Sequence, residues 1–291
     1  MEFNKLTLAD IETLRPFFNE NPSRICDRTI GGTFMWRDYH NTSYTIVDGI
    51  LYLNMTSPNI AFAPPRGQGV GRDEYQRILD HNGGGSALLC SVSEDDLDDI
   101  LKLFPDSIVK TDRAWSDYLY LSEDIVNLAG RRYSGQRNHI NRFKRETDVW
   151  SFKRITGDIL PQATAFIEKY LREHTKNSQA YDQGNKKTLE ALNNLELYGV
   201  VGGALYVEDE IIGLSLGEIV GDTLFIHAEK AEIEHHGSYP MLVNQFAKTF
   251  ATDGVVYINR EEDDGVEGLR TSKLSYHPTA LLNKYTVEIR G

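Results

Sequence analysis

The pattern of hydrophobic and polar positions is most informative over residues 224–250. An apolar run at 224–226 predicts a short strand, which leads into polar residues and then Gly237-Ser238. The next residues predict a helix, because the apolar positions fall on one helical face at 242, 243, 246, 247 and 250. A strand, a polar loop and a helix N-terminus together favour a small-molecule site, since the helix start offers unpaired N–H groups to an anion.

The first half of the chain alternates between short strands and helices. Asp48-Gly49, between two alternating segments, is typical of a type I′ hairpin turn, and Ser93 precedes acidic residues as a helix cap does. We expect helices over 8–19, 73–81 and 94–103, a hairpin over 43–55, and strands over 61–65, 87–92 and 115–121.

The second half predicts a different order of elements. We expect a strand over 150–155, helices over 158–174 and 185–197, hairpin strands over 199–206 and 211–219, the strand and helix of 224–250, and strands over 255–258 and 281–289. This order predicts a mixed sheet with one crossover helix. The fold class is therefore α+β, with two domains over 1–124 and 150–291, each a mixed and mostly antiparallel sheet flanked by helices, joined by a basic helix over 125–149.

Composition describes an ordinary globular protein. The chain has 291 residues, of which 40% are hydrophobic and 25% charged, and no run reaches the ~18 apolar residues of a membrane span. The N-terminus has no apolar signal region, so we expect a cytoplasmic protein without stable membrane insertion. Two cysteines without a CxxC spacing, and no acid–histidine spacing, argue against a disulfide scaffold or a metal site.

Charge is unevenly distributed. The net charge of −12 argues against general binding of nucleic acid or anionic membranes. Residues 131–145 nevertheless carry six Arg or Lys and no acid, so the rest of the chain carries a formal −18. This segment is either a solvated helix face or a docking surface for a phosphate-rich ligand.

Three blocks, in order, resemble one family. They are residues 137–144, residues 227–231 with 237–239, and residues 259–278. Together they are similar to DUF2156 proteins, which are related to the C-terminal domain of phosphatidylglycerol lysyltransferases. The resemblance implies tandem GNAT-like domains. In the lysyltransferases the corresponding domain moves an aminoacyl group from tRNA to a lipid head group.

The chain departs from the acetyl-CoA-binding pattern of GNAT proteins at residues 234–239. Glu234 stands where a basic or amide residue is usual, Tyr239 replaces a small residue, and Pro240 removes an N–H group. These departures argue against CoA at this site and favour a different donor. Residues 66–71 do fit Arg-x-x-Gly-x-Gly, and they form either a phosphate cradle or a plain loop.

The candidate catalytic residues are Glu229, His227 and Asp264. His227 and Glu229 alternate on a strand and share one face, where Glu229 would orient or deprotonate a nucleophile and His227 would titrate near neutral pH. The alternative is an ordinary polar strand end. Asp264 either contacts substrate or braces the Asp264-Gly265 turn.

The candidate donor- and substrate-binding residues lie in the same three blocks. Arg270 and Lys273 are neighbours on one face if helical, where they either bind a phosphate or carboxylate or form a surface face. Lys230 points away from Glu229 and forms either a structural ion pair or a substrate contact. The set is Arg137, Asn138, His139, Asn141, Lys144, Lys230, Gly237, Ser238, Tyr239, Asn259, Arg260, Arg270 and Lys273.

The expected function is transfer of an aminoacyl or acyl group to an amine or hydroxyl. The donor would be aminoacyl-tRNA, held at the basic helix, or a CoA thioester, and the acceptor a small molecule or a lipid head group. The alternatives are a CoA-dependent N-acetyltransferase and a non-catalytic GNAT-fold binding protein. The residues leave all three open.

Overall fold

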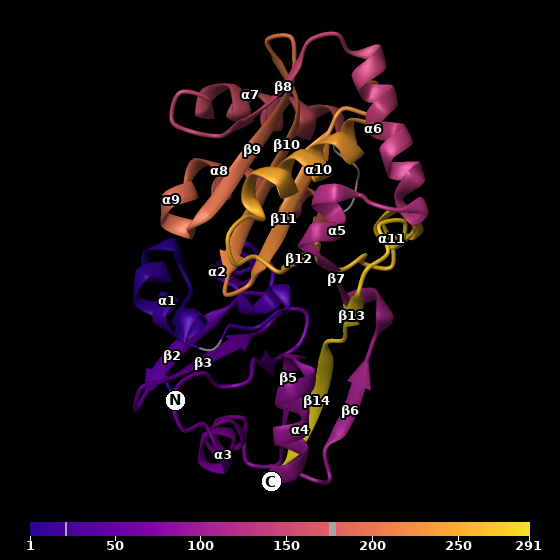
Figure 1. Ribbon diagram of the computed structural model, residues 1–291. Coiled ribbons are helices and arrows are strands. Elements are labelled where there is room, and N and C mark those ends of the chain that lie inside the picture. The colour runs from indigo at the N-terminus through magenta and orange to yellow at the C-terminus, as the bar shows by residue number, and fades with distance from the viewer. Residues whose placement is uncertain (21, 175–178) are drawn as a thin grey trace. The chain divides into compact units, whose positions relative to one another are not determined.

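The computed structural model describes residues 1–20, 22–174 and 179–291 (Figure 1). The chain forms two compact units. Unit 1 comprises Met1–Asp117, Glu262–Val266 and Leu281–Gly291, and unit 2 comprises Tyr118–Glu261 and Glu267–Ala280. The units are thus discontinuous along the chain, unlike the continuous domains over 1–124 and 150–291 that we expected.

Among the described residues, the sheet centred on unit 1 has seven strands in the order β1-β2-β3-β4-β5-β14-β6. The strands are β1 (Asn4–Lys5), β2 (Ser43–Val47), β3 (Ile50–Met55), β4 (Ala61–Phe62), β5 (Ser86–Val92), β6 (Ile108–Thr111) and β14 (Tyr285–Arg290). The helices are α1 (Ile11–Asn19), α2 (Ile30–Met35), α3 (Arg72–His81) and α4 (Glu94–Leu103), with short 3-10 turns that include Cys26–Arg28.

Local chemistry accounts for the predicted parts of unit 1. The β2–β3 hairpin turns at Asp48 and Gly49, whose φ angles of 52° and 77° are those of a type I′ turn. Ser93 caps α4 by accepting a hydrogen bond from Asp96 N–H. The C-terminal strand differs from expectation, because β14 pairs with β5 and β6 and does not close the second sheet (Figure 1).

The second sheet, centred on unit 2, has the order β13-β7-β12-β11-β10-β9-β8. Its strands are β7 (Asp117–Leu121), β8 (Trp150–Arg154), β9 (Val200–Val207), β10 (Glu210–Val220), β11 (Thr223–Ala231), β12 (Tyr257–Asn259) and β13 (Ala280–Leu282). The helices are α5 (Ser122–Asn127), α6 (Ser134–Glu146), α7 (Leu160–His174), α8 (Gln179–Asn193), α9 (Leu195–Tyr198), α10 (Ser238–Phe250) and α11 (Glu267–Leu274). The basic segment 125–149 therefore belongs to unit 2 and is broken between α5 and α6.

Strand β11 is the centre of unit 2. It pairs with β10 in antiparallel register from Gly213↔Ala231 to Val220↔Thr223, and the register shifts at His227, which has no partner in this ladder. On its other side β12 runs parallel and pairs with Thr223, Leu224 and Phe225. Residues 226–231 of β11 therefore extend beyond the end of β12.

Helix α10 is the crossover between β11 and β12, and it packs on β9, β10 and β11 (Figure 1). Its predicted apolar face is buried, with Leu242, Val243, Phe246, Ala247 and Phe250 at most 3% exposed. This burial drives the packing of the helix on the sheet. The predicted fold class, α+β with two mixed and mostly antiparallel sheets flanked by helices, is confirmed.

Candidate active site

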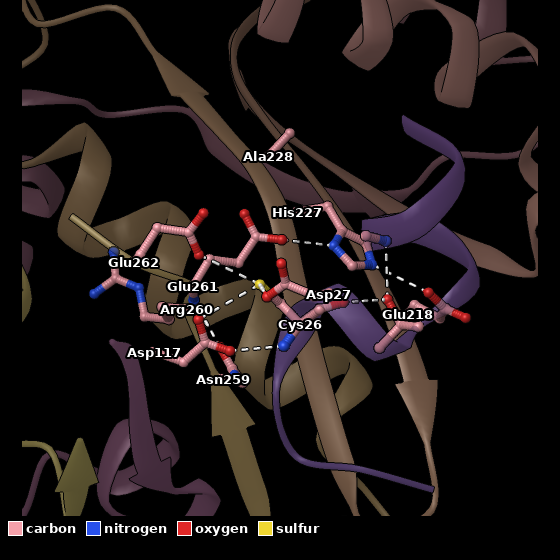
Figure 2. A network of polar contacts seen from close by, with 12 residues as sticks. Cys26, Asp27, Asp117, Glu218, His227, Ala228, Asn259, Arg260, Glu261 and Glu262 are labelled. Atoms are coloured by element: carbon pink, nitrogen blue, oxygen red, sulfur yellow. Dashed lines mark hydrogen bonds and ion pairs between the residues drawn. The ribbon is translucent and has the colours of Figure 1, made fainter. Parts of the chain in front are cut away.

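His227 lies on β11 between two carboxylates. Its Nδ1 is 2.8 Å from Glu261 Oε1 and its Nε2 is 3.2 Å from Glu218 Oε2 (Figure 2). Burial alone lowers the pKa of His227, but its hydrogen bonds to Glu218 and Glu261 raise that pKa to about 10. His227 is therefore an imidazolium at neutral pH, which differs from the expected titration near pH 7.

Glu229, two residues along β11, pairs with Arg260, which follows the end of β12. Glu229 Oε2 accepts hydrogen bonds from Arg260 Nη2 at 2.7 Å and from Nε at 3.2 Å. The Glu229 side chain is 14% exposed and that of Arg260 is 5% exposed. The second carboxylate oxygen of Glu229, Oε1, and the second terminal nitrogen of Arg260, Nη1, are buried. Neither has a hydrogen-bond partner among the described residues.

Hydrogen bonds to the Arg260 backbone and two tyrosine rings beside its guanidinium fix Arg260 in place. Arg260 N–H donates to Tyr118 carbonyl at 3.0 Å, and Arg260 carbonyl accepts from Lys273 Nζ at 2.6 Å. The guanidinium lies 4.7 Å from the ring centre of Tyr276 and 6.0 Å from that of Tyr120. Lys273 thus holds the Arg260 backbone through its ammonium, a contact that the sequence did not predict.

Asn259 also has a local role at the end of β12. It is fully buried, and its Oδ1 accepts a hydrogen bond from Glu261 N–H at 2.6 Å. This turn brings Glu261 toward His227. Glu218 and Glu261, the two carboxylates on His227, were not among the predicted site residues. The signal for Glu218 was an acid, now 5% exposed, inside the apolar run of β10.

Lys230 has different neighbours from His227 and Glu229. Its ammonium is 5.7 Å from the ring centre of Tyr170, whose hydroxyl is 3.3 Å from the hydroxyl of Tyr239. Burial lowers the pKa of Lys230. Tyr239 therefore lies with Tyr170 and Lys230, and not with the Glu229 carboxylate.

The N-terminus of α10 is already occupied by protein groups. A Cβ on Gly237, which has φ +87°, would lie 2.3 Å from His139 carbonyl oxygen on α6. Ser238 N–H donates to His235 carbonyl at 2.9 Å, and Ser238 Oγ donates to Glu232 carbonyl at 2.7 Å. Gly237 thus permits close packing of α10 on α6, and Ser238 closes the preceding loop.

Helix α6 buries Gln136, Ile140 and Phe143, leaves Arg137 half-buried and exposes its other charged positions. Arg137 Nη1 donates to the carbonyls of Leu128 and Gly130, at 2.6 Å for Gly130. Its guanidinium therefore stabilises the turn before α6. The other predicted residues of this helix are exposed at Asn138, His139, Asn141 and Lys144.

The predicted turn residue Asp264 is exposed and has φ 50°. Its neighbour Asp263 is fully buried, accepts from Gly265 N–H at 2.9 Å and pairs with Arg113 at 3.0 Å. Asp263 therefore makes the bracing contact that we considered for Asp264. Arg270 lies half-buried on α11, and the structure brings its helix neighbour Lys273 to Arg260.

Unit 1 contains a second charged cluster that the sequence did not predict. The Lys284 ammonium contacts Asp27, Asp117 at 2.8 Å, Glu262 at 2.9 Å and Cys26 Sγ at 3.1 Å. Figure 2 shows the hydrogen bonds of Cys26 to Asp117 and Glu262. Burial raises the pKa of Asp117 to about 7, although Lys284 lowers it.

The same cluster holds the one candidate set of metal ligands in the described part of the chain. The ligand atoms of Cys26, Asp27 and Asp117 lie within 4.8 Å of one another. The Lys284 ammonium already contacts all three and supplies the positive charge that they need. Burial also raises the pKa of the Cys26 thiol well above its usual range, so this thiol is not a ready nucleophile.

Solved structures support the fold. A conserved protein of unknown function from Bacteroides thetaiotaomicron is similar over 100% of both chains, at 29% identity and a TM-score of 0.91. The C-terminal domain (DUF2156) of a putative lysylphosphatidylglycerol synthetase from Agrobacterium fabrum is similar over 98% of this chain and 93% of that one, at 13% identity and a TM-score of 0.70.

Sequence comparison gives the family. An uncharacterized protein of Mycoplasmoides gallisepticum is 25% identical over 176 residues, which are 60% of this chain and 56% of that relative. No helix in the described ranges is both long and apolar enough to cross a membrane. The family model described as phosphatidylglycerol lysyltransferase, C-terminal, matches residues 18–288. The chain therefore belongs to the phosphatidylglycerol lysyltransferase C-terminal family.

Proposed function

We propose that this protein transfers an aminoacyl group from aminoacyl-tRNA to an amine or hydroxyl acceptor, beside Glu229 and Arg260. Membership of the lysyltransferase family supports this reaction class. The Agrobacterium relative is described as a putative lysylphosphatidylglycerol synthetase. Lysyl-tRNA and the hydroxyl of a phosphatidylglycerol head group are therefore the first donor and acceptor to test.

The observation that carries the proposal is the incomplete hydrogen bonding of one buried ion pair. Glu229 Oε1 lacks a donor and Arg260 Nη1 lacks an acceptor among the described residues. Leaving such groups without partners costs roughly 1–3 kcal/mol each, more when they are charged. An aminoacyl ester carries the two matching groups, because its α-ammonium donates and its carbonyl oxygen accepts.

The proposed chemistry follows from this match. The acceptor oxygen or nitrogen forms a bond to the ester carbonyl carbon, the bond to the ribose oxygen breaks, and the acceptor's proton ends on that departing oxygen. Negative charge develops on the carbonyl oxygen during attack, and the Arg260 guanidinium would stabilise it. His227 is already protonated at neutral pH, so its role is to hold Glu218 and Glu261 and not to act as a base.

A CoA-dependent acetyltransferase is the less favoured alternative. A pyrophosphate at the start of α10 needs free N–H groups. Ser238 N–H is used by His235 carbonyl, Pro240 has no N–H, and Gly237 packs against His139 carbonyl. These contacts argue for a donor that does not depend on this helix terminus.

The test is a transfer assay with radiolabelled lysyl-tRNA and phosphatidylglycerol vesicles. We expect wild-type protein to label the lipid and Glu229→Gln to lose roughly 100-fold or more in rate, because the charged partner of the α-ammonium and of Arg260 is removed. Glu232→Gln is the matched control, since Glu232 lies just after β11 and pairs with Lys169 at 2.8 Å.

Three results would contradict the proposal. One is equal lipid labelling by wild type and Glu229→Gln. The second is acetyl transfer from acetyl-CoA to an amine with no aminoacyl transfer from charged tRNA, which would favour the acetyltransferase. The third is an absence of transfer from both donors, together with binding of a lysine ester to the wild type, which would favour the non-catalytic binding protein.

A further inference from the structure

Two arginine side chains lie close together inside unit 1. Arg28 ends the 3-10 turn Cys26–Arg28, and Arg66 follows β4. Arg66 Nη1 is 3.4 Å from the carbonyl oxygen of Arg28, and the guanidinium of Arg28 lowers the pKa of Arg66 through repulsion, after the larger effect of burial. The like charges are therefore near enough to destabilise each other.

One carboxylate neutralises only part of this pair. Asp96 Oδ2 is 2.6 Å from Arg28 Nη1 and also accepts from the N–H of Ser93, the cap of α4, at 3.2 Å. No carboxylate of a described residue lies within ion-pair distance of Arg66. Two positive charges and one negative charge leave the group with a net charge of about +1 at neutral pH, because guanidinium groups are almost always protonated.

Donor groups of the pair are also left over. Arg28 Nε is buried and has no hydrogen-bond partner within the described ranges. The Arg66 side chain has five N–H donors by chemistry, and its one hydrogen bond to a described residue is the long contact to Arg28 carbonyl. Buried arginines normally bind a carboxylate or phosphate through paired donors, so both side chains lack part of their usual partner.

The protein nevertheless holds Arg66 firmly in this position. Its backbone exchanges hydrogen bonds with Leu51, at 2.8 Å and 3.0 Å. The guanidinium lies 4.7 Å from the ring centre of Phe18, and the residue is 8% exposed. The arginine therefore has a fixed direction and a small accessible surface, as a preorganised binding group does.

The loop that follows does not provide the anion site by its backbone. A Cβ on Gly67 would lie 2.7 Å from Gly49 carbonyl oxygen, so this glycine serves packing on the hairpin. Gly71 N–H donates to Glu74 Oε2 at 2.8 Å, so a carboxylate already caps α3. The Arg-x-x-Gly-x-Gly pattern of residues 66–71 therefore contributes its arginine and not a phosphate cradle.

We propose that Arg28 and Arg66 form a binding site in unit 1 for a small oxyanion, the phosphate or carboxylate group of a ligand. The anion would accept from Arg28 Nε and from the free donors of Arg66, and it would neutralise the remaining positive charge. This site is separate from the Glu229–Arg260 pair and does not rest on the proposed transferase activity.

The test measures thermal unfolding of the full chain in sodium phosphate, sodium acetate and sodium chloride at matched ionic strength. We expect the wild-type melting temperature to rise by about 2 to 4 °C over chloride when the anion is at roughly five times its dissociation constant. The anion that produces the rise identifies the class, phosphate or carboxylate. Arg66→Met should show no such rise and should melt at or above the wild-type temperature in chloride, because a buried repulsive charge is gone.

Arg77→Met is the matched control. Arg77 lies in the same unit and pairs with Asp48 at 2.6 Å, but its side chain is 37% exposed. It should keep the wild-type response to the anion. Equal responses of wild type and Arg66→Met, or no response of the wild type to either anion, would overturn the proposal. If Arg66→Met does not fold, calorimetric titration of the wild type with inorganic phosphate and with acetate decides, and a lack of binding heat with both refutes the site.

Discussion

At the scale of single residues, the charge state of His227 decides what the β11 carboxylates can do. The imidazole is 2% exposed and contacts Glu218 and Glu261, which favour its protonated form. The folded protein therefore keeps a proton that the unfolded chain loses near pH 6.5. Because the folded pKa is raised, the stabilisation is fully present below pH 6.5 and is lost as pH rises toward about 10.

The replacement His227→Gln tests this linkage. Between pH 6.5 and 9 the free energy of unfolding of the wild type should fall by roughly 2 to 4 kcal/mol more than that of His227→Gln. The range stops at pH 9 because the buried thiol of Cys26 and the half-buried thiol of Cys90 also have raised pKa values and add their own pH dependence above it. Urea unfolding at several pH values provides the measurement, and His236→Gln, whose side chain is 59% exposed, is the control. Parallel pH curves for wild type and His227→Gln would show that the histidine is not held as an imidazolium.

At the scale of elements, the local sequence pattern predicted single helices and hairpins, but it did not predict which distant segments pair. Helix α10 was predictable because its apolar face repeats at helical spacing, and the hairpin because Asp48-Gly49 defines its turn. The four residues of β6, Ile108–Thr111, are all exposed, so no buried alternation marked them as a strand. Glu261 reaches His227 from 34 residues further along the chain, and Asp27 and Asp117 reach Lys284 from the first half of the sequence. Single-residue patterns carry no information on which acids meet in this way.

Helix α6 is the element through which the proposed tRNA contact can be tested. The sequence indicated a basic segment, but Arg137 is committed to the carbonyls of Leu128 and Gly130. We therefore expect Lys144 and Arg145, both exposed, to contact phosphates. Reversing both to Glu should weaken binding of charged tRNA about tenfold or more and reduce the slope of log affinity against log salt by about 1.5.

Filter binding over a salt series measures this change. The control reverses Lys153 and Lys248, which are exposed on other elements of unit 2. Lys153 lies 4.5 Å from the ring centre of Tyr206, much as Lys144 lies 5.4 Å from that of Trp150, so both double variants lose one cation–π contact. Equal loss of tRNA affinity in the two double variants would mean that α6 is an ordinary solvated face.

At the scale of the whole molecule, unit 1 is built from both ends of the sequence and not from its first half alone. Segments from the C-terminal part of the sequence return to unit 1, which contains Glu262–Val266 and Leu281–Gly291. Strand β14 lies between β5 and β6 and bonds to both, and its Val287 and Ile289 are fully buried. Lys284, at the start of this segment, carries the ammonium that neutralises Asp27, Asp117 and Glu262. Unit 1 therefore depends on the last residues of the sequence for both its sheet and its buried charge balance.

A truncation after Asn283 tests this dependence, because it removes β14 and Lys284 and keeps β13. The loss leaves β5 and β6 without their shared partner and buries three carboxylates without a cation, which should unfold unit 1. Hydrogen exchange should then accelerate by roughly 100-fold or more at the amides of β3 and β5, while β10 and α10 in unit 2 keep most of their protection. Removing only Arg290 and Gly291 is the control, since the buried positions of β14 remain. Unchanged protection of β5 after the larger truncation would mean that the first sheet folds without its C-terminal strand, and that the charged cluster does not need Lys284.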